Sequence, residues 1–175
     1  MTSGGHAPGR LFAPWRADYV QVRAADGETC PFCQLAAAPP DRFRSLGVLA
    51  AGEHSLVVLN RYPYQAGHVL ICPRRHVARL PEVPAICRRE MDHWMVQVVE
   101  ALEQAMGCHG VNLGLNQGKA AGAGVAGHLH WHAVPRWQGD HNFMPVLGDT
   151  HVLPEDPQST YDRLVDWFTL EGEDT

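Results

Sequence analysis

The chain has 175 residues, enough for one domain with a sizeable core, and its 45% hydrophobic and 19% charged residues are typical of a globular protein. The net charge of -5 argues against a nucleic acid polymer as partner, because a domain that binds one is usually basic. No apolar run approaches the roughly 20 residues that span a bilayer, and we expect neither a signal peptide nor a membrane partner.

The N-terminal part of the chain predicts little regular structure. Residues 1–10 are glycine-rich, and we expect a flexible terminus there, followed by a single domain over residues 11–175. The aromatic and apolar segment 11–20 predicts a stretch that packs against the domain. Residues 26–42 contain Cys-Pro-Phe-Cys, for which we expect a loop with a tight turn, leading into one helical turn that a Pro-Pro pair ends.

The next segment predicts three strands in a meander. Residues 46–60 predict two strands with a turn near Gly52, the second strand being Ser55–Leu59. A turn with proline and glycine follows, and then a strand over His68–Cys72.

A long helix is predicted over Pro84–Met106, and Gly107 is a suitable stop signal. Its apolar residues recur at steps of mainly three and four, which gives one stripe that faces a core. The stripe consists of Ile86, Met91, Trp94, Met95, Val98, Leu102 and Met106.

The C-terminal half predicts two more strands and a second helix. Residues 110–116 predict a strand, 117–127 a glycine-rich loop, and 128–136, which alternate with period two, another strand. Residues 159–170 predict a C-terminal helix with Ser159 as N-cap. This order of elements favours an α+β fold with a mostly antiparallel sheet.

The segment Gly-His-Leu-His-Trp-His places His128, His130 and His132 at every second position. Side chains alternate across a strand, so the three imidazoles are expected on one face, with Leu129 and Trp131 on the other, towards the core.

Three interpretations of these histidines compete. They are a polar surface face, or a metal site, since imidazole is a common zinc ligand. Alternatively, one neutral imidazole attacks phosphorus, while its neighbours and backbone N–H groups of the glycine-rich loop hold phosphate oxygens.

The five cysteines are an odd number, which favours a reducing compartment, and we expect a cytoplasmic protein. Cys30 and Cys33 have the spacing that lets two thiolates reach one tetrahedral ion, but such a pair is also compatible with a redox role. Two further ligands must then come from elsewhere in the chain. The other cysteines are expected to be buried apolar residues: Cys72, Cys87 and Cys108.

The sequence HLHWHAV at 128–134 matches H-φ-H-φ-H-φ-φ, the signature of the histidine triad (HIT) superfamily. The segment 59–83 resembles that family's strand-turn-strand region with its Asn, Gly-His and Pro-Arg-x-His. Residues 11–20 and the Cys-Pro-Phe-Cys motif resemble its bacterial CxxC branch. Residues 132–146 resemble the branch with diadenosine tetraphosphate phosphorylases and related hydrolases. The likeness covers roughly residues 10–153 and implies a HIT-like fold, with about five antiparallel strands, one long helix and a C-terminal helix.

The resemblance implies nucleotidyl transfer from a dinucleoside polyphosphate through a nucleotidyl-histidine. It makes His130 the nucleophile, and His132 a residue that contacts phosphate oxygens and assists the leaving group. Asn60 matches the position that binds the ribose hydroxyls, and His68 lies at a position beside the nucleotide. Asn112, on the neighbouring strand, has an amide able to bond a phosphate or the triad.

The resemblance also implies a ligand set for the cysteine pair. In HIT proteins with a CxxC, the partners are the histidine of Pro-Arg-x-His and the first histidine of the triad, here His76 and His128. A closed zinc site with Cys30 and Cys33 is structural and pins the N-terminal loop to the catalytic strand. A homodimer is implied as well, and no organic cofactor is expected.

The chain departs from the family pattern in the loop before the triad. Gly122, Ala123 and Gly124 stand where polar side chains that bind phosphate are expected. Backbone N–H groups can still bind a phosphate there, and Gln117 and Lys119 are near enough to substitute. This leaves hydrolase versus phosphorylase open. Trp137 is a candidate to stack on a base, or else a core or interface residue.

Two rival functions remain. The altered loop favours a nucleotide-binding regulatory module with little turnover. The alternating histidines also fit a metal-dependent hydrolase, in which they bind a catalytic zinc.

Overall fold

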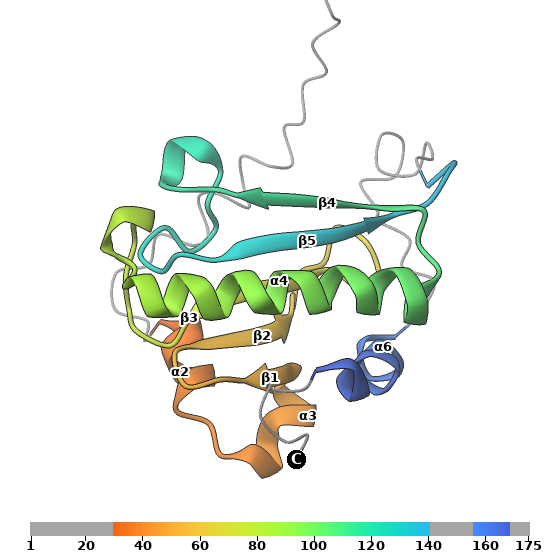
Figure 1. Cartoon of the computed structure of the whole chain (residues 1–175), viewed down its shortest axis with the longest axis horizontal. Helices are drawn as coiled ribbons and strands as arrows, with labels where there is room; N and C mark the ends of the chain where they lie inside the picture. Colours follow the sequence, from red (N-terminus) through yellow and green to blue (C-terminus); the bar gives the residue numbers. More distant parts are fainter. Residues whose placement is uncertain (1–29, 141–155, 169–175) are drawn as a thin grey trace, which may run out of the picture.

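The structure is a computed structural model that describes residues 30–140 and 156–168 (Figure 1). The predicted flexible terminus and the predicted packed segment 11–20 lie outside these residues, so the division into residues 1–10 and 11–175 stays a prediction. Within the described residues, no helix is long and apolar enough to cross a membrane.

Five antiparallel strands form one sheet in the order β1-β2-β3-β5-β4 (Figure 1). The predicted sheet is thus confirmed, and the strand bounds differ from the predicted ones by only a few residues. The largest change is in β5, which the alternating pattern started at residue 128. The strands are β1 (Val48–Ala51), β2 (Ser55–Leu59), β3 (Val69–Pro73), β4 (Gly110–Leu115) and β5 (Trp131–Arg136).

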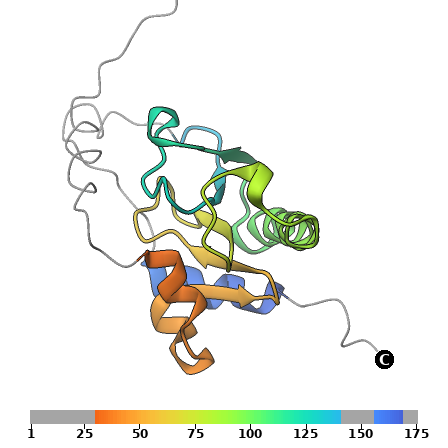
Figure 2. The same ribbon diagram turned by 90° about the vertical axis from the view of Figure 1, so that its left-hand side faces the viewer.

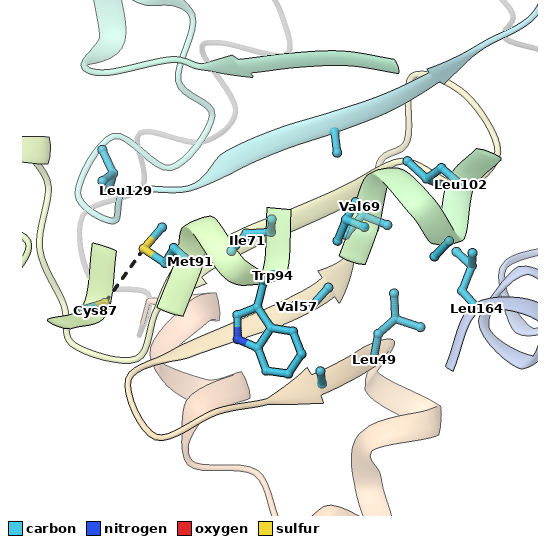
Figure 3. Close-up of a cluster of buried hydrophobic side chains, with 14 of the residues drawn as sticks. Leu49, Val57, Val69, Ile71, Cys87, Met91, Trp94, Leu102, Leu129 and Leu164 are labelled. Atoms are coloured by element: carbon cyan, nitrogen blue, oxygen red, sulfur yellow. Dashed lines mark hydrogen bonds between the residues drawn. The ribbon is translucent and has the colours of Figure 1, made fainter. Parts of the chain in front are cut away.

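The long helix α4 (Ala85–Met106) lies along one face of the sheet (Figures 1 and 2). Pro84 is its N-cap, and Gly107 ends it in the left-handed conformation, which glycine adopts without steric cost. Trp94, only 1% exposed, is its largest buried side chain and packs in a cluster with strand residues and Leu164 (Figure 3). The predicted stripe is confirmed except at Ile86, which is 52% exposed.

The opposite face of β1–β3 is covered by α2 (Pro31–Ala36) and α3 (Phe43–Leu46), as Figure 2 shows. A short 3-10 helix, Pro40–Arg42, joins them. Sequence analysis predicted a loop and one helical turn here, so this part was underestimated. Phe32 anchors α2 in a second cluster with Val48, Leu56, Val58, Leu70 and Cys72.

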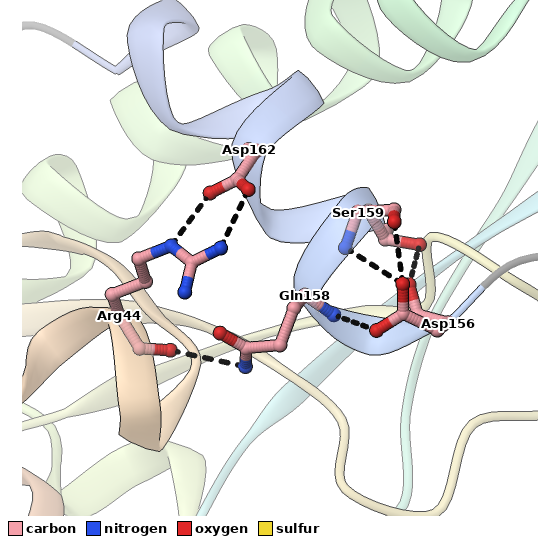
Figure 4. A network of polar contacts seen from close by, with 6 residues as sticks. Arg44, Asp156, Gln158, Ser159 and Asp162 are labelled. Atoms are coloured by element: carbon pink, nitrogen blue, oxygen red, sulfur yellow. Dashed lines mark hydrogen bonds and ion pairs between the residues drawn. The ribbon is translucent and has the colours of Figure 1, made fainter.

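The C-terminal helix α6 (Pro157–Leu164) is capped by Asp156. The carboxylate of Asp156 accepts hydrogen bonds from the backbone N–H groups of Gln158 and Ser159, and the Ser159 hydroxyl also donates to it (Figure 4). The prediction of Ser159 as N-cap was therefore wrong, because an earlier aspartate followed by Pro157 caps the helix better. A bidentate ion pair between Arg44 and Asp162 joins α3 to α6 (Figure 4).

Candidate functional site

The three alternating histidines lie at the start of β5, on the face of the sheet opposite α4. The rings of His130 and His132 lie with centroids 5.0 Å apart. Leu129 and Ala133, between and after them, are buried in the core under α4, as the alternation predicted. His128 and His130 precede the first residue of β5, so an extended segment rather than the strand itself holds them.

The ring of His130 is oriented by its own backbone. Its Nδ1 lies 2.8 Å from the carbonyl oxygen of His128. A carbonyl only accepts hydrogen bonds, so Nδ1 carries a proton, and in the uncharged form of this ring the lone pair is on Nε2, at the tip of the side chain. His130 is 5% exposed, at the base of the site.

A chain of hydrogen bonds fixes the tautomers of two further imidazoles. The backbone N–H of Tyr64 donates to Nδ1 of His68 (3.1 Å), so the proton of His68 is on Nε2. This Nε2 lies 3.0 Å from Nδ1 of His132, which must accept. His132 therefore carries its proton on Nε2. That nitrogen is buried and has no hydrogen-bond partner among the described residues.

Burial keeps both rings of this chain neutral. Desolvation, with smaller contributions from His132 and His130, lowers the pKa of His68 to about 3. Desolvation and the neighbouring His130 lower the pKa of His132 to about 4. At neutral pH Nε2 of His132 therefore presents an N–H donor. Because this donor is buried and unsatisfied, an oxygen of a bound ligand would stabilise it.

His68 is placed by the turn before β3. Gly67 has a φ of +82°, and a Cβ there would lie 3.2–3.3 Å from Pro135, Leu102 and Met106, so only glycine fits without strain. Asn60, predicted to bind ribose, points at the same imidazole: its Nδ2 lies 3.2 Å from Nδ1 of His68. Its Oδ1 accepts the N–H of Tyr62. The predicted group of Asn60, His68, His130 and His132 is thus brought together.

Two predicted contacts lie elsewhere. Asn112 lies opposite Val134 on β4, and its Oδ1 accepts a hydrogen bond from Arg136. Trp137 follows β5, five residues beyond His132, and its indole N–H donates to the Gly107 carbonyl at the end of α4. Trp137 packs against the core, whereas Asn112 is exposed, and their predicted contacts with a nucleotide stay predictions.

The glycine-rich loop contains a 3-10 turn, Lys119–Ala121, and Gly124 lies shortly after it. The N–H of Gly122 donates to the carbonyl of Lys119 (3.0 Å). The tight turn therefore uses this N–H group, and the predicted contact of Gly122 with a phosphate stays a prediction. Gln117, considered as a substitute donor, accepts the N–H of Leu80 through its Oε1.

The second cluster consists of Cys30, Cys33, His76 and His128, whose four ligand atoms lie within 4.8 Å of one another. Cys30 Sγ and Cys33 Sγ each lie 3.3 Å from the Nδ1 of a histidine, His128 and His76 respectively. Ligands on a tetrahedral zinc are about 3.5 Å apart when Zn–S is about 2.3 Å and Zn–N about 2.0 Å. The spacing therefore fits one ion.

His128 has the tautomer that a metal ligand needs. Its Nε2 lies 2.8 Å from the carbonyl of Pro73 and so donates, which leaves the lone pair on Nδ1, facing the cysteines. Desolvation lowers the pKa of this buried ring, so it is neutral. The residues present fit a metal ion, and the alternative of a surface histidine is excluded for His128, which is fully buried.

Sequence reasoning missed two aromatic residues. Phe32 lies between the two cysteines, and its ring centroid is 5.1 Å from that of His128 and 4.8 Å from that of His130. Tyr64 lies against His68 and, at 6.1 Å and 15° between planes, parallel to His132. The signals were an aromatic inside Cys-x-x-Cys and one shortly before Gly-His.

The fold and the arrangement of histidines define a nucleotide-processing class of protein. Residues 47–139 match the HIT domain family model, and the chain belongs to the HIT family.

Among its relatives is a Mycobacterium tuberculosis protein named AP-4-A phosphorylase, 33% identical over 150 residues, which cover 83% of this chain and 77% of that one. A Dictyostelium discoideum bis(5'-adenosyl)-triphosphatase is 31% identical over 104 residues, 58% of this chain and 67% of that one. A Zn-bound histidine triad family protein from Mycobacterium smegmatis superposes with a TM-score of 0.63 and 25% identity, over 79% and 92% of the two chains.

Proposed function

We propose that this protein cleaves a phosphoric anhydride bond of a dinucleoside polyphosphate, such as diadenosine tetraphosphate, through a nucleotide bound covalently to His130. HIT relatives that act on such anhydrides support the substrate class. The observation that carries the proposal is the pair of tautomers, a lone pair on Nε2 of His130 beside an N–H on Nε2 of His132.

In the first step, Nε2 of His130 attacks the α-phosphorus. A P–N bond forms, the P–O bond to the rest of the polyphosphate breaks, and its electron pair leaves with that oxygen. The proton stays on Nδ1 and is donated in a hydrogen bond to the carbonyl of His128, which stabilises the ring as it becomes positive. The N–H of His132 donates to a phosphate or leaving-group oxygen, and supplies the charge stabilisation that grows in the transition state.

In the second step, an oxygen of water or of inorganic phosphate attacks the same phosphorus. The P–N bond breaks and its electrons return to Nε2 of His130. With water, which gives up a proton to the solvent, the nucleotide leaves as a monophosphate, and with inorganic phosphate it leaves as a diphosphate. The mycobacterial phosphorylase among the relatives favours phosphate as the acceptor.

We propose zinc as the ion of the second cluster, held by Cys30, Cys33, His76 and His128, and structural in role. Four protein ligands leave no position for a water, which argues against the metal-dependent hydrolase. When bound, the ion ties the segment before β1 to the start of β5. The donor geometry and the zinc-bound relative from Mycobacterium smegmatis support this assignment.

Product analysis tests the reaction. Protein incubated with radiolabelled diadenosine tetraphosphate and quenched within milliseconds is expected to carry label, and the variant His130→Ala is expected to carry none. ADP that appears only with inorganic phosphate identifies a phosphorylase, and AMP with ATP in water identifies a hydrolase. Turnover without any label on the protein would contradict the covalent mechanism.

A nucleotide-binding regulatory module is the second candidate. The loop before the triad favours it, because it has glycine and alanine in place of polar side chains and the N–H of Gly122 is used within the turn. Binding of AMP at a stoichiometry of one, with neither label nor product, would identify this module.

We also propose a homodimer, which rests on the resemblance. The edge strand β4, with Leu113 46% exposed, offers an apolar surface for it. Light scattering during size-exclusion chromatography measures the mass, and a monomer at micromolar concentration would contradict the dimer.

A further inference from the structure

The phenyl ring of Phe32 lies against a histidine of the metal cluster and against the proposed nucleophile. Its centroid is 5.1 Å from that of His128, in the metal cluster, and 4.8 Å from that of His130, with interplanar angles of 50° and 34°. Phe32 is thus in contact with a metal ligand and with the nucleophile at once.

Two features hold this ring in place. Phe32 is 6% exposed and packs on the sheet among residues of β1, β2 and β3. The two cysteines of the cluster, Cys30 and Cys33, flank it in the chain, at the start of α2. An ion that joins these cysteines to His128 therefore fixes Phe32 from both sides.

The nucleophile benefits from such a contact. The hydrogen bond from Nδ1 of His130 to the carbonyl of His128 orients the ring, and the direction of Nε2 also depends on what packs against the ring faces. A flat side chain packed against the imidazole restricts its motion. Misplacement of a reacting atom by about 1 Å can cost roughly 100-fold in rate.

We propose that Phe32 is a positioning residue, which transmits the order of the metal cluster to the ring of His130. This inference rests on the proposed function of His130. Phe32 contributes by holding the direction of Nε2 and makes no bond to the substrate. The segment Cys-Pro-Phe-Cys thus links the structural ion to the reacting atom through one aromatic ring.

The test compares Phe32→Leu with the matched variant Leu35→Ala. Leu35 also lies on α2 and packs against the same cluster, so its truncation weakens the helix without removing the ring beside His130. Both proteins are purified with zinc, and the zinc content is measured. For Phe32→Leu we expect kcat to fall by about tenfold or more with KM within about twofold, and for Leu35→Ala we expect both to stay within about twofold.

A second readout does not depend on turnover. The proton on Nδ1 of His130 is followed by NMR in protein with labelled histidine, with His130→Asn used for assignment. We expect its exchange with water to be at least about tenfold faster in Phe32→Leu and in the zinc-free wild type, and unchanged in Leu35→Ala.

The outcomes separate this inference from the proposed function. A zinc-loaded Phe32→Leu with wild-type kcat and wild-type exchange overturns the role of Phe32 and leaves the covalent mechanism standing. A wild type that never carries label contradicts the proposed function, while the exchange measurement still tests the ring. If Phe32→Leu loses zinc, and added zinc restores both readouts, the positioning role is also overturned. Phe32→Met serves as the second variant if Phe32→Leu does not fold.

Discussion

The imidazoles of the metal cluster and those of the proposed catalytic group lie side by side on one face of the sheet. They differ in which ring nitrogen the backbone fixes by a hydrogen bond and which one is presented to a ligand. His128 donates from Nε2 to Pro73 and presents Nδ1 to the cysteines, whereas His130 donates from Nδ1 and presents Nε2. Nδ1 lies close to the backbone, which suits an ion enclosed by protein. Nε2 lies at the tip of the ring, which suits an attack on a substrate. Two histidines only two residues apart thus differ in function through the carbonyl that each one meets.

The largest effect on kcat is expected from a substitution of His130 itself. The variant His130→Asn keeps a polar side chain of similar size but has no basic ring nitrogen, so we expect kcat to fall by at least about 10⁴-fold. Rates with diadenosine tetraphosphate and the label on quenched protein measure this. The idea fails if the asparagine variant still becomes labelled.

The metal cluster is tested by Cys33→Ser, which removes one thiolate. We expect the zinc content to fall well below one per chain and the free energy of unfolding to drop by roughly 3–5 kcal/mol, about 10 °C in Tm. Metal analysis and thermal unfolding measure these changes. Cys108→Ala, outside the cluster, is the control and should keep its zinc. A Cys33→Ser protein of unchanged Tm would show that the cluster does not stabilise the fold.

The tautomer chain is tested by His68→Leu. Without the N–H of His68, nothing fixes the proton of His132 on Nε2, so we expect kcat to fall by about 10- to 100-fold. The zinc content should not change, which distinguishes this row of hydrogen bonds from the metal cluster. His54→Leu, a partly buried imidazole outside both groups, should stay within about twofold. Equal losses of kcat in the two variants would contradict the role of His68 in fixing the tautomer of His132.

The smallest effect concerns pH. The pKa of His132 is about 4 in the folded protein and near 6.5 when unfolded, so between these values the unfolded chain binds the additional proton. Stability therefore falls as pH drops from 6.5 towards 4, by on the order of 1 kcal/mol per pH unit from this group. Urea unfolding at three pH values should show a shallower decline for His132→Asn than for the wild type. Parallel declines would mean that His132 is not held neutral.

The sequence predicted the sheet and the long helix well because their signals are local. Ser55–Leu59 is a short apolar run between turn signals, and its predicted and observed bounds agree. Gly107 ended the helix as expected. The N-cap of α6 was predicted wrongly at Ser159. Asp156 and Ser159 are both residue types that cap helices, and the preference for an aspartate followed by proline was overlooked. Before β1 only one helical turn was predicted where two short helices lie, since their stability comes from packing of Phe32 and Phe43 on the sheet rather than from a periodic pattern.

The candidate site was predicted as a set of residues and only partly as a set of contacts. Asn60, His68 and the triad lie close together, because the strand pairing of β3 with β5 brings residues 69–71, directly after His68, beside residues 131–133. Asn112 and Gly122 were assigned by position along the chain, and hydrogen bonds to Arg136 and Lys119 give their polar groups other partners.

The amino-acid sequence alone determined that three imidazoles share one face, that two thiols have the spacing to reach one ion, and which family these residues indicate. Alternation and spacing are properties of the chain, so they can be read before it folds. Only the tertiary structure decided which nitrogen of each ring carries the proton. That choice depends on the carbonyl of Pro73 and the N–H of Tyr64, groups distant in sequence whose positions exist only after the sheet has formed.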